Sequence, residues 1–136
     1  MTTQDESAPS EFPSRSTRAR LAWMEMCAIV RGLVAQANRE AGETVLCDDG
    51  TAPANELVIR LQDGQGFKLV FDQEQSRVIC EFPHYPNFNR ALEISARADA
   101  HKGKAIWTDL RTGAPVGNEE IAGNLVRNLL IMTSDS

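Results

Sequence analysis

The middle of this chain alternates apolar and polar residues in three consecutive runs, which is the period of a β-strand with one buried face. The runs cover residues 57–62, 67–71 and 77–82. The first two are joined by the sequence DGQG at positions 63–66, and Asp-Gly between alternating runs is a strong hairpin signal. The connection at 72–76 is also short. These features predict three antiparallel strands that follow one another across a sheet.

A second hairpin is predicted further along the chain. Apolar residues occupy every second position over 92–98, although Arg, Ala, Leu and Glu are also good helix formers. The unbroken alternation favours a strand over a helix here. The turn sequence HKG at 101–103 separates it from a further strand at 104–110. The sheet is therefore expected to have five strands, with 44–47 as a short additional candidate and 111–117 as a loop.

Two amphipathic helices flank the predicted strands. Residues 17–41 place apolar side chains at steps of three and four, the helical period, and Gly42 is a suitable end. The members of this stripe are Trp23, Cys27, Val30, Val34, Ala37 and Ala41. Ser16 or Thr17 can cap the start of this helix. A second helix is predicted to begin at Asn118, a favourable N-cap, and to run toward the end of the sequence.

The first helix carries more apolar surface than one neighbour would cover. Further apolar residues widen its stripe around much of the helix: Leu21, Met24, Ala28, Ile29 and Leu33. Such a helix is either buried between several elements or paired with another chain, because broad exposed apolar patches usually mark interfaces.

The order of helix, strands and helix predicts the α+β class. A sheet with one apolar face needs a cover, and two apolar helices need a surface to bury. We therefore expect a two-layer sandwich with an N-terminal helix, a five-stranded and mostly antiparallel meander sheet, and a C-terminal helix packed on the same face. Residues 15–136 are expected to form this single domain. Residues 1–14, rich in Ser, Pro and acidic side chains, are expected to be a disordered tail.

Charge and cysteine content weigh against several functional classes. The net charge of −5 and the pI of about 5.0 count against nucleic acid as a partner, because nucleic-acid binders usually present a basic face. Cys27, Cys47 and Cys80 show no CxxC spacing, so we expect reduced thiols and no metal site. The sequence suggests no cofactor. It shows neither a signal peptide nor an apolar run of ~20 residues, so we expect a cytoplasmic protein with no membrane partner.

The uncovered face of the predicted sheet is the first candidate binding surface. Val58, Val70 and Ile79 are apolar residues on a face that should be wet, and together they could form a small docking patch. Arg60 and Trp107 are assigned to the same surface, although Trp107 is equally compatible with the core. The charged residues of this face also fit a simple solvated ladder of cross-strand ion pairs.

The loop at 82–90 is the second candidate. It is stiffened by two prolines, and its candidate binding residues are His84, Tyr85, Phe88 and Arg90. The alternative is a crossover loop whose aromatic residues cap the edge of the core. An acid–base pair of His84 and Tyr85 would suggest an enzyme, but the sequence places no nucleophile beside them. No catalytic residue is therefore assigned.

These observations favour a non-enzymatic protein-binding or adaptor module, chaperone-like in kind, that binds a protein partner or itself. In the second case a homodimer would form through the first helix or the open sheet face. The alternative is a small enzyme or small-ligand-binding domain centred on the loop at 82–90. The small acidic α+β chaperones of secreted bacterial proteins resemble this chain in general composition. Frataxin-like proteins are similar in the order of elements, but the first helix here has only Glu25 and Glu40 as acids, which does not support iron handling.

Overall fold

The computed structural model describes residues 14–83, 89–94 and 106–134, and the fold is given for these residues. Helix α1 (Arg15–Ala41) precedes the strands, and helix α2 (Asn118–Ser134) follows them. The strands of the described residues are β2 (Leu46–Asp48), β3 (Glu56–Leu61), β4 (Gly66–Asp72), β5 (Arg77–Glu81), β6 (Arg90–Ile94), β7 (Ile106–Asp109) and β8 (Pro115–Gly117).

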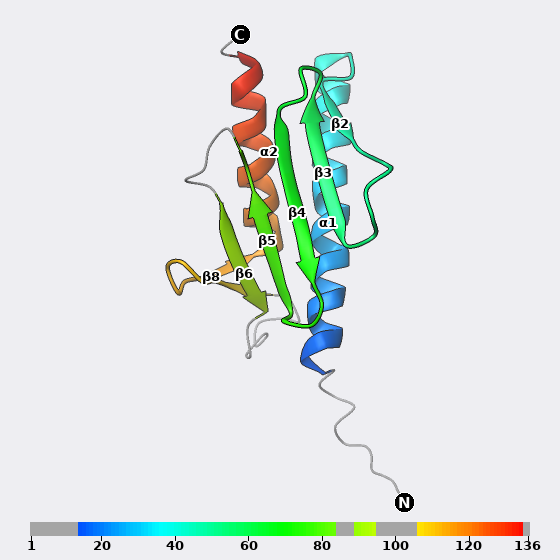
Figure 1. Cartoon of the computed structure of the whole chain (residues 1–136). Coiled ribbons are helices and arrows are strands. Elements are labelled where there is room, and N and C mark those ends of the chain that lie inside the picture. The colour runs from blue at the N-terminus through cyan, green and yellow to red at the C-terminus, as the bar shows by residue number, and fades with distance from the viewer. Residues whose placement is uncertain (1–13, 84–88, 95–105, 135–136) are drawn as a thin grey trace, which may run out of the picture.

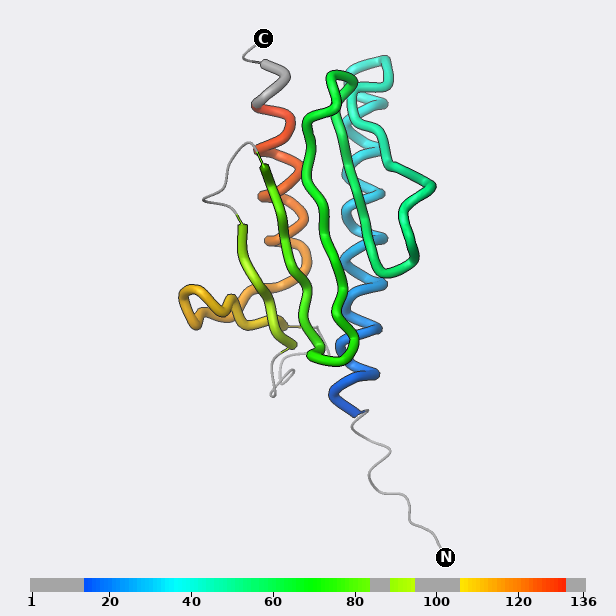
Figure 2. Tube along the Cα trace, viewed as in Figure 1, coloured from blue at the N-terminus to red at the C-terminus, as the bar shows by residue number. Residues whose placement is uncertain are grey.

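The seven strands form one antiparallel sheet in which neighbours in sequence are neighbours in space. Helices α1 and α2 pack against each other behind this sheet, while no helix of the described residues lies on the opposite face (Figure 1). The Cα trace shows the same two layers, with the meander in front and both helices behind it (Figure 2). The predicted α+β sandwich is therefore confirmed. We call the face without helices the open face.

Over the described residues the sheet has seven strands instead of the five expected, and β2 overlaps the short additional candidate at 44–47. β2 and β8 lie at its two edges and are three residues long, too short to show an alternating pattern. The expected loop at 111–117 ends in β8, whose Val116 pairs with Trp107 of β7. Pro115 has no backbone N–H to donate, and it is tolerated there because one side of an edge strand has no neighbouring strand to accept such a bond. The hairpin predicted before this loop is confirmed over the described residues of β6 and β7.

Helix α1 begins at Arg15, slightly earlier than predicted, because Ser14 rather than Ser16 or Thr17 is its N-cap. The Ser14 hydroxyl accepts a hydrogen bond from the backbone N–H of Thr17 at 3.2 Å. The helix ends at Gly42, as predicted, where φ is 73°. Glycine adopts this left-handed conformation without the steric cost of a Cβ.

The helix-covered face of the sheet and the inner sides of both helices form one hydrophobic core. Trp23 of α1 stacks on Phe71 of β4 with ring centroids 5.6 Å apart. Phe67 packs against Phe82 at 5.9 Å. The core therefore holds the three-strand meander, whose hairpin turns the sequence already indicated, against the first helix.

Helix α1 packs against both the sheet and α2, and it still leaves part of its apolar surface uncovered. Leu21 and Met24 are 54% and 58% exposed. Ala28, one turn further along, is also exposed. We call these three residues the α1 stripe. The wide apolar surface seen in the sequence is thus buried on two sides and exposed on a third.

The start of α2 is tied into the core by Asn118, which is 3% exposed. Its side-chain oxygen accepts a hydrogen bond from Trp107 Nε1 at 2.7 Å. Its Nδ2 donates to the Ala22 carbonyl oxygen at 3.1 Å and to Glu25 Oε1 at 2.6 Å. The residue that the sequence suggested as an N-cap therefore links β7, α1 and α2.

Candidate functional site

An apolar row crosses the open face. Val70 of β4 pairs with Ile79 of β5, which pairs with Ala91 of β6. Leu110, directly after β7, continues the row, because its backbone N–H donates to the Ala91 carbonyl oxygen at 2.9 Å. Leu110 is 40% exposed, and the other three residues are half-buried. We call these four residues the apolar row.

Two of the three aliphatic residues that the sequence placed on this face, Val70 and Ile79, are direct cross-strand neighbours. Val58 lies one row further along the strands, opposite Lys68. It is only 8% exposed and lines a shallow groove together with Arg60 and Lys68. The predicted patch therefore exists, but its exposed centre lies around Val70 and Ile79 rather than Val58.

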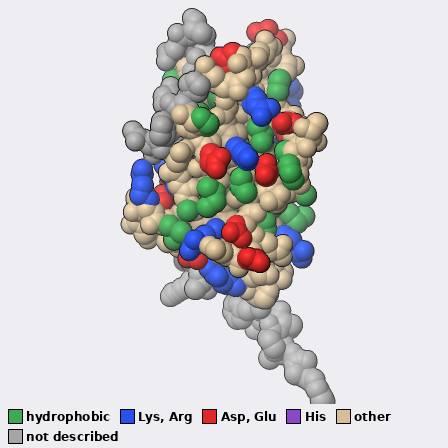
Figure 3. Space-filling model, viewed as in Figure 1, with side chains coloured by type: hydrophobic (Ala, Val, Ile, Leu, Met, Phe, Trp, Pro, Cys, Tyr) green, Lys and Arg blue, Asp and Glu red, His purple; other side chains and the backbone are tan. Residues whose placement is uncertain are grey.

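Charged residues flank the apolar row on both sides. Toward one end of β4 and β5, Lys68 pairs with Glu81 in the sheet register. Toward the other end, Asp72 lies opposite Arg77 in the register of the two strands. The space-filling view shows this mixture, with apolar side chains across the face and both signs of charge beside them (Figure 3). The open face therefore combines an apolar centre with a charged rim.

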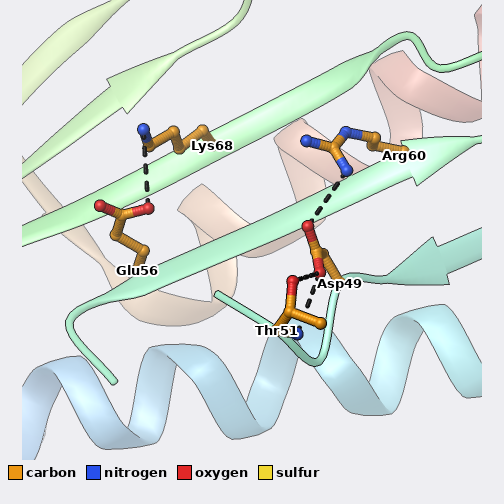
Figure 4. A network of polar contacts seen from close by, with 5 residues as sticks. All are labelled: Asp49, Thr51, Glu56, Arg60 and Lys68. Atoms are coloured by element: carbon orange, nitrogen blue, oxygen red, sulfur yellow. Dashed lines mark hydrogen bonds and ion pairs between the residues drawn. The ribbon is translucent and has the colours of Figure 1, made fainter. Parts of the chain in front are cut away.

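Several charges of the rim are held by ion pairs within the chain. Lys68 Nζ lies 3.6 Å from Glu56 Oε1, and Arg60 Nη1 lies 3.1 Å from Asp49 Oδ2 (Figure 4). The Thr51 hydroxyl and backbone N–H also donate to Asp49, at 2.6 and 3.0 Å. These hydrogen bonds, together with Arg60, hold the pKa of Asp49 below its ordinary value. Exposed pairs of this kind contribute little to stability, because solvent and salt screen them.

At the other end of the strands, Glu93 is bound by two arginines. Arg15 Nη2 lies 2.7 Å and Arg77 Nε 3.5 Å from the same Glu93 carboxylate oxygen. Among the described residues, Asp72 and Glu81 have no ion-pair partner. The solvated ladder predicted for this face is therefore only partly closed, and two carboxylates remain outside it.

Trp107 does not belong to the open face, so its assignment as a binding residue of that surface was wrong. The side chain is fully buried, and its sheet partners Ile94 and Val116 lie on the helix-covered side. The indole N–H is satisfied by Asn118, which allows the large ring to enter the core without a buried unpaired donor. The sequence alone left both orientations open.

The loop at 82–90 is only partly described. Three of its candidate residues lie outside the described residues, and their roles stay predictions: His84, Tyr85 and Phe88. Its two ends are linked by a hydrogen bond in which the Phe82 backbone N–H donates to Asn89 Oδ1 at 2.6 Å. Phe82 itself is fully buried in the core.

Arg90, the fourth candidate of this loop, is the first residue of β6 and lies on the helix-covered side of the sheet. Its Nη1 lies 3.4 Å from Oδ2 of Asp109, which is 6% exposed. Arg90 borders a cavity of about 350 Å³ between the sheet and α2. The other lining residues include Cys80, Phe82, Val116, Glu120, Ile121 and Leu125. Arg90 is thus separated from the open face by the thickness of the sheet.

The three cysteines are free, and two of them are buried. Burial raises the pKa of the Cys27 thiol to about 11 and that of the Cys80 thiol to about 12. Thiols with pKa values this high stay protonated at neutral pH, so they are poor nucleophiles and poor metal ligands. Within the described part of the chain, no group of three His, Cys, Asp or Glu side chains is placed to hold a metal ion.

No protein-family model, curated protein or solved structure matches this chain. Over the described residues, neither helix has the length and apolar character needed to cross a membrane. The open face is therefore assigned as the candidate site on its own geometry.

The sequence reasoning missed two members of the apolar row, Ala91 and Leu110. Ala91 falls on the opposite side of β6 from Leu92, and Leu110 falls on the opposite side from Trp107 and Asp109. The alternation contains this information. To place Ala91 and Leu110 in the row, however, the register of β6 against β5 and β7 must be known. The sequence of the connecting residues 82–90 and 95–105 does not give that register.

Proposed function

We propose that this chain is a non-enzymatic protein-binding module of the adaptor or chaperone kind, and that it binds its partner through the open face. The observation that carries the proposal is the apolar row across β4, β5 and β6. The residues on a sheet face that contacts only water are usually polar. An apolar centre with a charged rim is instead the composition of protein interfaces.

Two further features support a binding rather than a catalytic role. The thiols of Cys27 and Cys80 are buried, with pKa values of about 11 and 12, which does not suit them as nucleophiles. On the open face, Lys68 and Arg60 form ion pairs with Glu56 and Asp49. This suits them better to the charged rim of a binding surface than to acid–base catalysis. The free cysteines also support our placement of the module in the cytoplasm.

Photocrosslinking in cells tests the open face as the binding surface. A photoreactive amino acid at Ile79 would report contacts at the centre of the apolar row. The same group at Gln36, an exposed residue of α1, is the matched control. We expect a discrete crosslinked product from Ile79 and none from Gln36, and the mass of the product identifies the partner.

A second substitution makes the crosslinking result specific. Val70→Arg places a charge beside Ile79 in the apolar row, and we expect it to remove the product while far-UV circular dichroism stays unchanged. Equal labelling from Ile79 and Gln36, or no product from Ile79 in any growth condition, would contradict the proposed function.

A small-ligand-binding role is the second candidate, and the cavity beside Arg90 favours it. The cavity of about 350 Å³ is the size of a small metabolite site. Leu125→Trp should fill this space. If the cavity binds a ligand, a compound that raises the melting temperature of the wild-type chain should lose that effect in Leu125→Trp. An equal rise in both chains would exclude the cavity as the site.

A further inference from the structure

We infer that a second copy of this chain covers the open face, packed sheet to sheet about a two-fold axis that runs along the apolar row. This inference rests on the proposed function, because it names the occupant of the same surface. It depends on the arrangement of charges around the row, which is self-complementary under this symmetry.

Rotation about the apolar row exchanges the two ends of each strand and keeps each strand over its own copy. On β4, Lys68 and Asp72 lie at equal distances on either side of Val70. The rotation therefore places Lys68 of one chain over Asp72 of the second copy. On β5, Arg77 and Glu81 flank Ile79 in the same way and meet across the interface. The two strands thus bring opposite charges together at four places.

The intrachain ion pairs leave room for these contacts. Asp72 and Glu81 have no ion-pair partner among the described residues. The side chains of Lys68 and Arg77, which would meet them, keep 41% and 36% of their surface exposed. Of the carboxylates on the described strands of the open face, Asp72 and Glu81 lack a cation in the single chain, and the second copy would supply each of them with one.

Other two-fold axes in the plane of the sheet fit less well. An axis along the strands between β4 and β5 would also bring opposite charges together, with Lys68 over Glu81 and Asp72 over Arg77. It would, however, place Ala91 over Glu56 twice, apolar against charged, which the axis along the row does not do. An axis between β5 and β6 would place Glu81 over Asn89 and leave its carboxylate without a cation. The axis along the row places Glu56 near its own copy, but Lys68 at 3.6 Å already offsets that charge.

The expected dimer is weak. Antiparallel strands are about 4.8 Å apart, so the apolar row is about 15 Å long. Sheets that pack face to face keep their strand directions nearly aligned, as this axis requires. An apolar row of this length is short beside interfaces that bury ~800 Å² per partner, so we expect a weak dimer that dissociates in the micromolar range or above.

Sedimentation velocity of the full chain at low salt, from about 10 to 500 µM to bracket that range, tests the inference. The wild-type chain should approach about 30 kDa, twice the 15.0 kDa of one copy. Lys68→Glu alone and Asp72→Lys alone should each weaken self-association at least about tenfold, because each brings like charges together twice. An equimolar mixture of the two variants should dimerise again, since each variant then meets the opposite charge.

The controls separate this inference from its alternatives. Leu21→Glu in the α1 stripe should leave the dimer intact; loss of the dimer there, but not with Lys68→Glu, would place the interface on α1 and overturn the inference. Failure of the mixture to recover would overturn the proposed axis. A wild-type chain that stays at 15.0 kDa throughout would overturn self-association. The proposed function would survive that result if Ile79 still crosslinks another protein in cells.

Discussion

At the residue scale, the β3–β4 hairpin depends on a glycine at position 66. A Cβ added to Gly66 would overlap the Ile59 carbonyl oxygen and lie 2.8 Å from Arg60 Cα. Both are backbone atoms of the paired strand, so neither can move without disturbing the register. The sequence showed a glycine-rich turn here, but only the structure shows which glycine the neighbouring backbone requires.

Gly66→Ala should therefore be strongly destabilising. We expect a loss of about 2–3 kcal/mol in the free energy of unfolding, the upper part of the range for single substitutions. Gly32→Ala is the matched control, because a Cβ at this helical position meets nothing within 4 Å. It should gain up to about 1 kcal/mol from helix propensity. Urea denaturation followed by circular dichroism measures both, and equal stability of the two variants would contradict the steric argument.

Asn118 is the second residue on which the fold depends. Asn118→Ala would leave the buried Trp107 N–H and the Ala22 carbonyl oxygen without their side-chain partner. A buried polar group left unpaired costs about 1–3 kcal/mol, so we expect a loss of that order or more. Asn124→Ala, an exposed position of the same helix, should change stability by less than about 0.5 kcal/mol. Thermal denaturation of both variants checks this, and a neutral Asn118→Ala would show that the network does not stabilise the fold.

At the element scale, helix α1 presents three different environments. One side faces the sheet, one faces α2, and the α1 stripe faces away from both. The sequence indicated a helix that is apolar around much of its girth. It could not show which of these residues are covered, because that depends on where the sheet and α2 lie.

Adjacent residues of α1 should therefore respond very differently to the same charge. Leu21→Glu changes a side chain that is 54% exposed and should alter stability by less than about 0.5 kcal/mol. Ala22→Glu buries a carboxylate at a position that is 2% exposed, and we expect it to unfold the chain or to cost several kcal/mol. Circular dichroism and thermal melting distinguish the two variants, and equal effects would mean that α1 packs in a different orientation.

At the scale of the whole molecule, the described residues form two layers rather than three, and this is why a surface is left for binding. Both helices cover the same side of the sheet (Figure 1). The other side keeps the apolar row between two charged ends. A third layer, whether a partner protein or a second copy, would complete the burial of that row.

Thiol labelling reports on the integrity of the whole core. At pH 8, Cys47 is exposed and should react readily with Ellman's reagent. Cys27, whose pKa is about 11, would be ionised in only about one molecule in a thousand, and Cys80 in fewer. We expect one modified thiol per native chain and three in denaturant, counted by mass spectrometry. Rapid modification of all three in the native state would show that the core opens.

Local chemistry explains which parts of this protein could be predicted from the sequence. Some signals act over only a few residues: the alternation, the Asp-Gly turn at 63–64 and the stop at Gly42. The helices, the β3–β4–β5 meander and the α+β class could therefore be predicted from the sequence. The same signals also placed Val70 and Ile79 on one face. Strand β2 was only a candidate and β8 was expected to be a loop, because both short strands depend on pairing along the edges of the sheet rather than on a pattern of their own.

Tertiary structure alone decided the rest. The register of β6 and β7 brings Ala91 and Leu110 into line with Val70 and Ile79. The hydrogen bond from Trp107 to Asn118 allows the indole to lie in the core, an orientation that an alternating sequence permits but does not select. The physical reason is that local rules fix which residues share a side of one strand. Which strands meet, and which face the helices cover, depends on contacts between residues far apart in the chain.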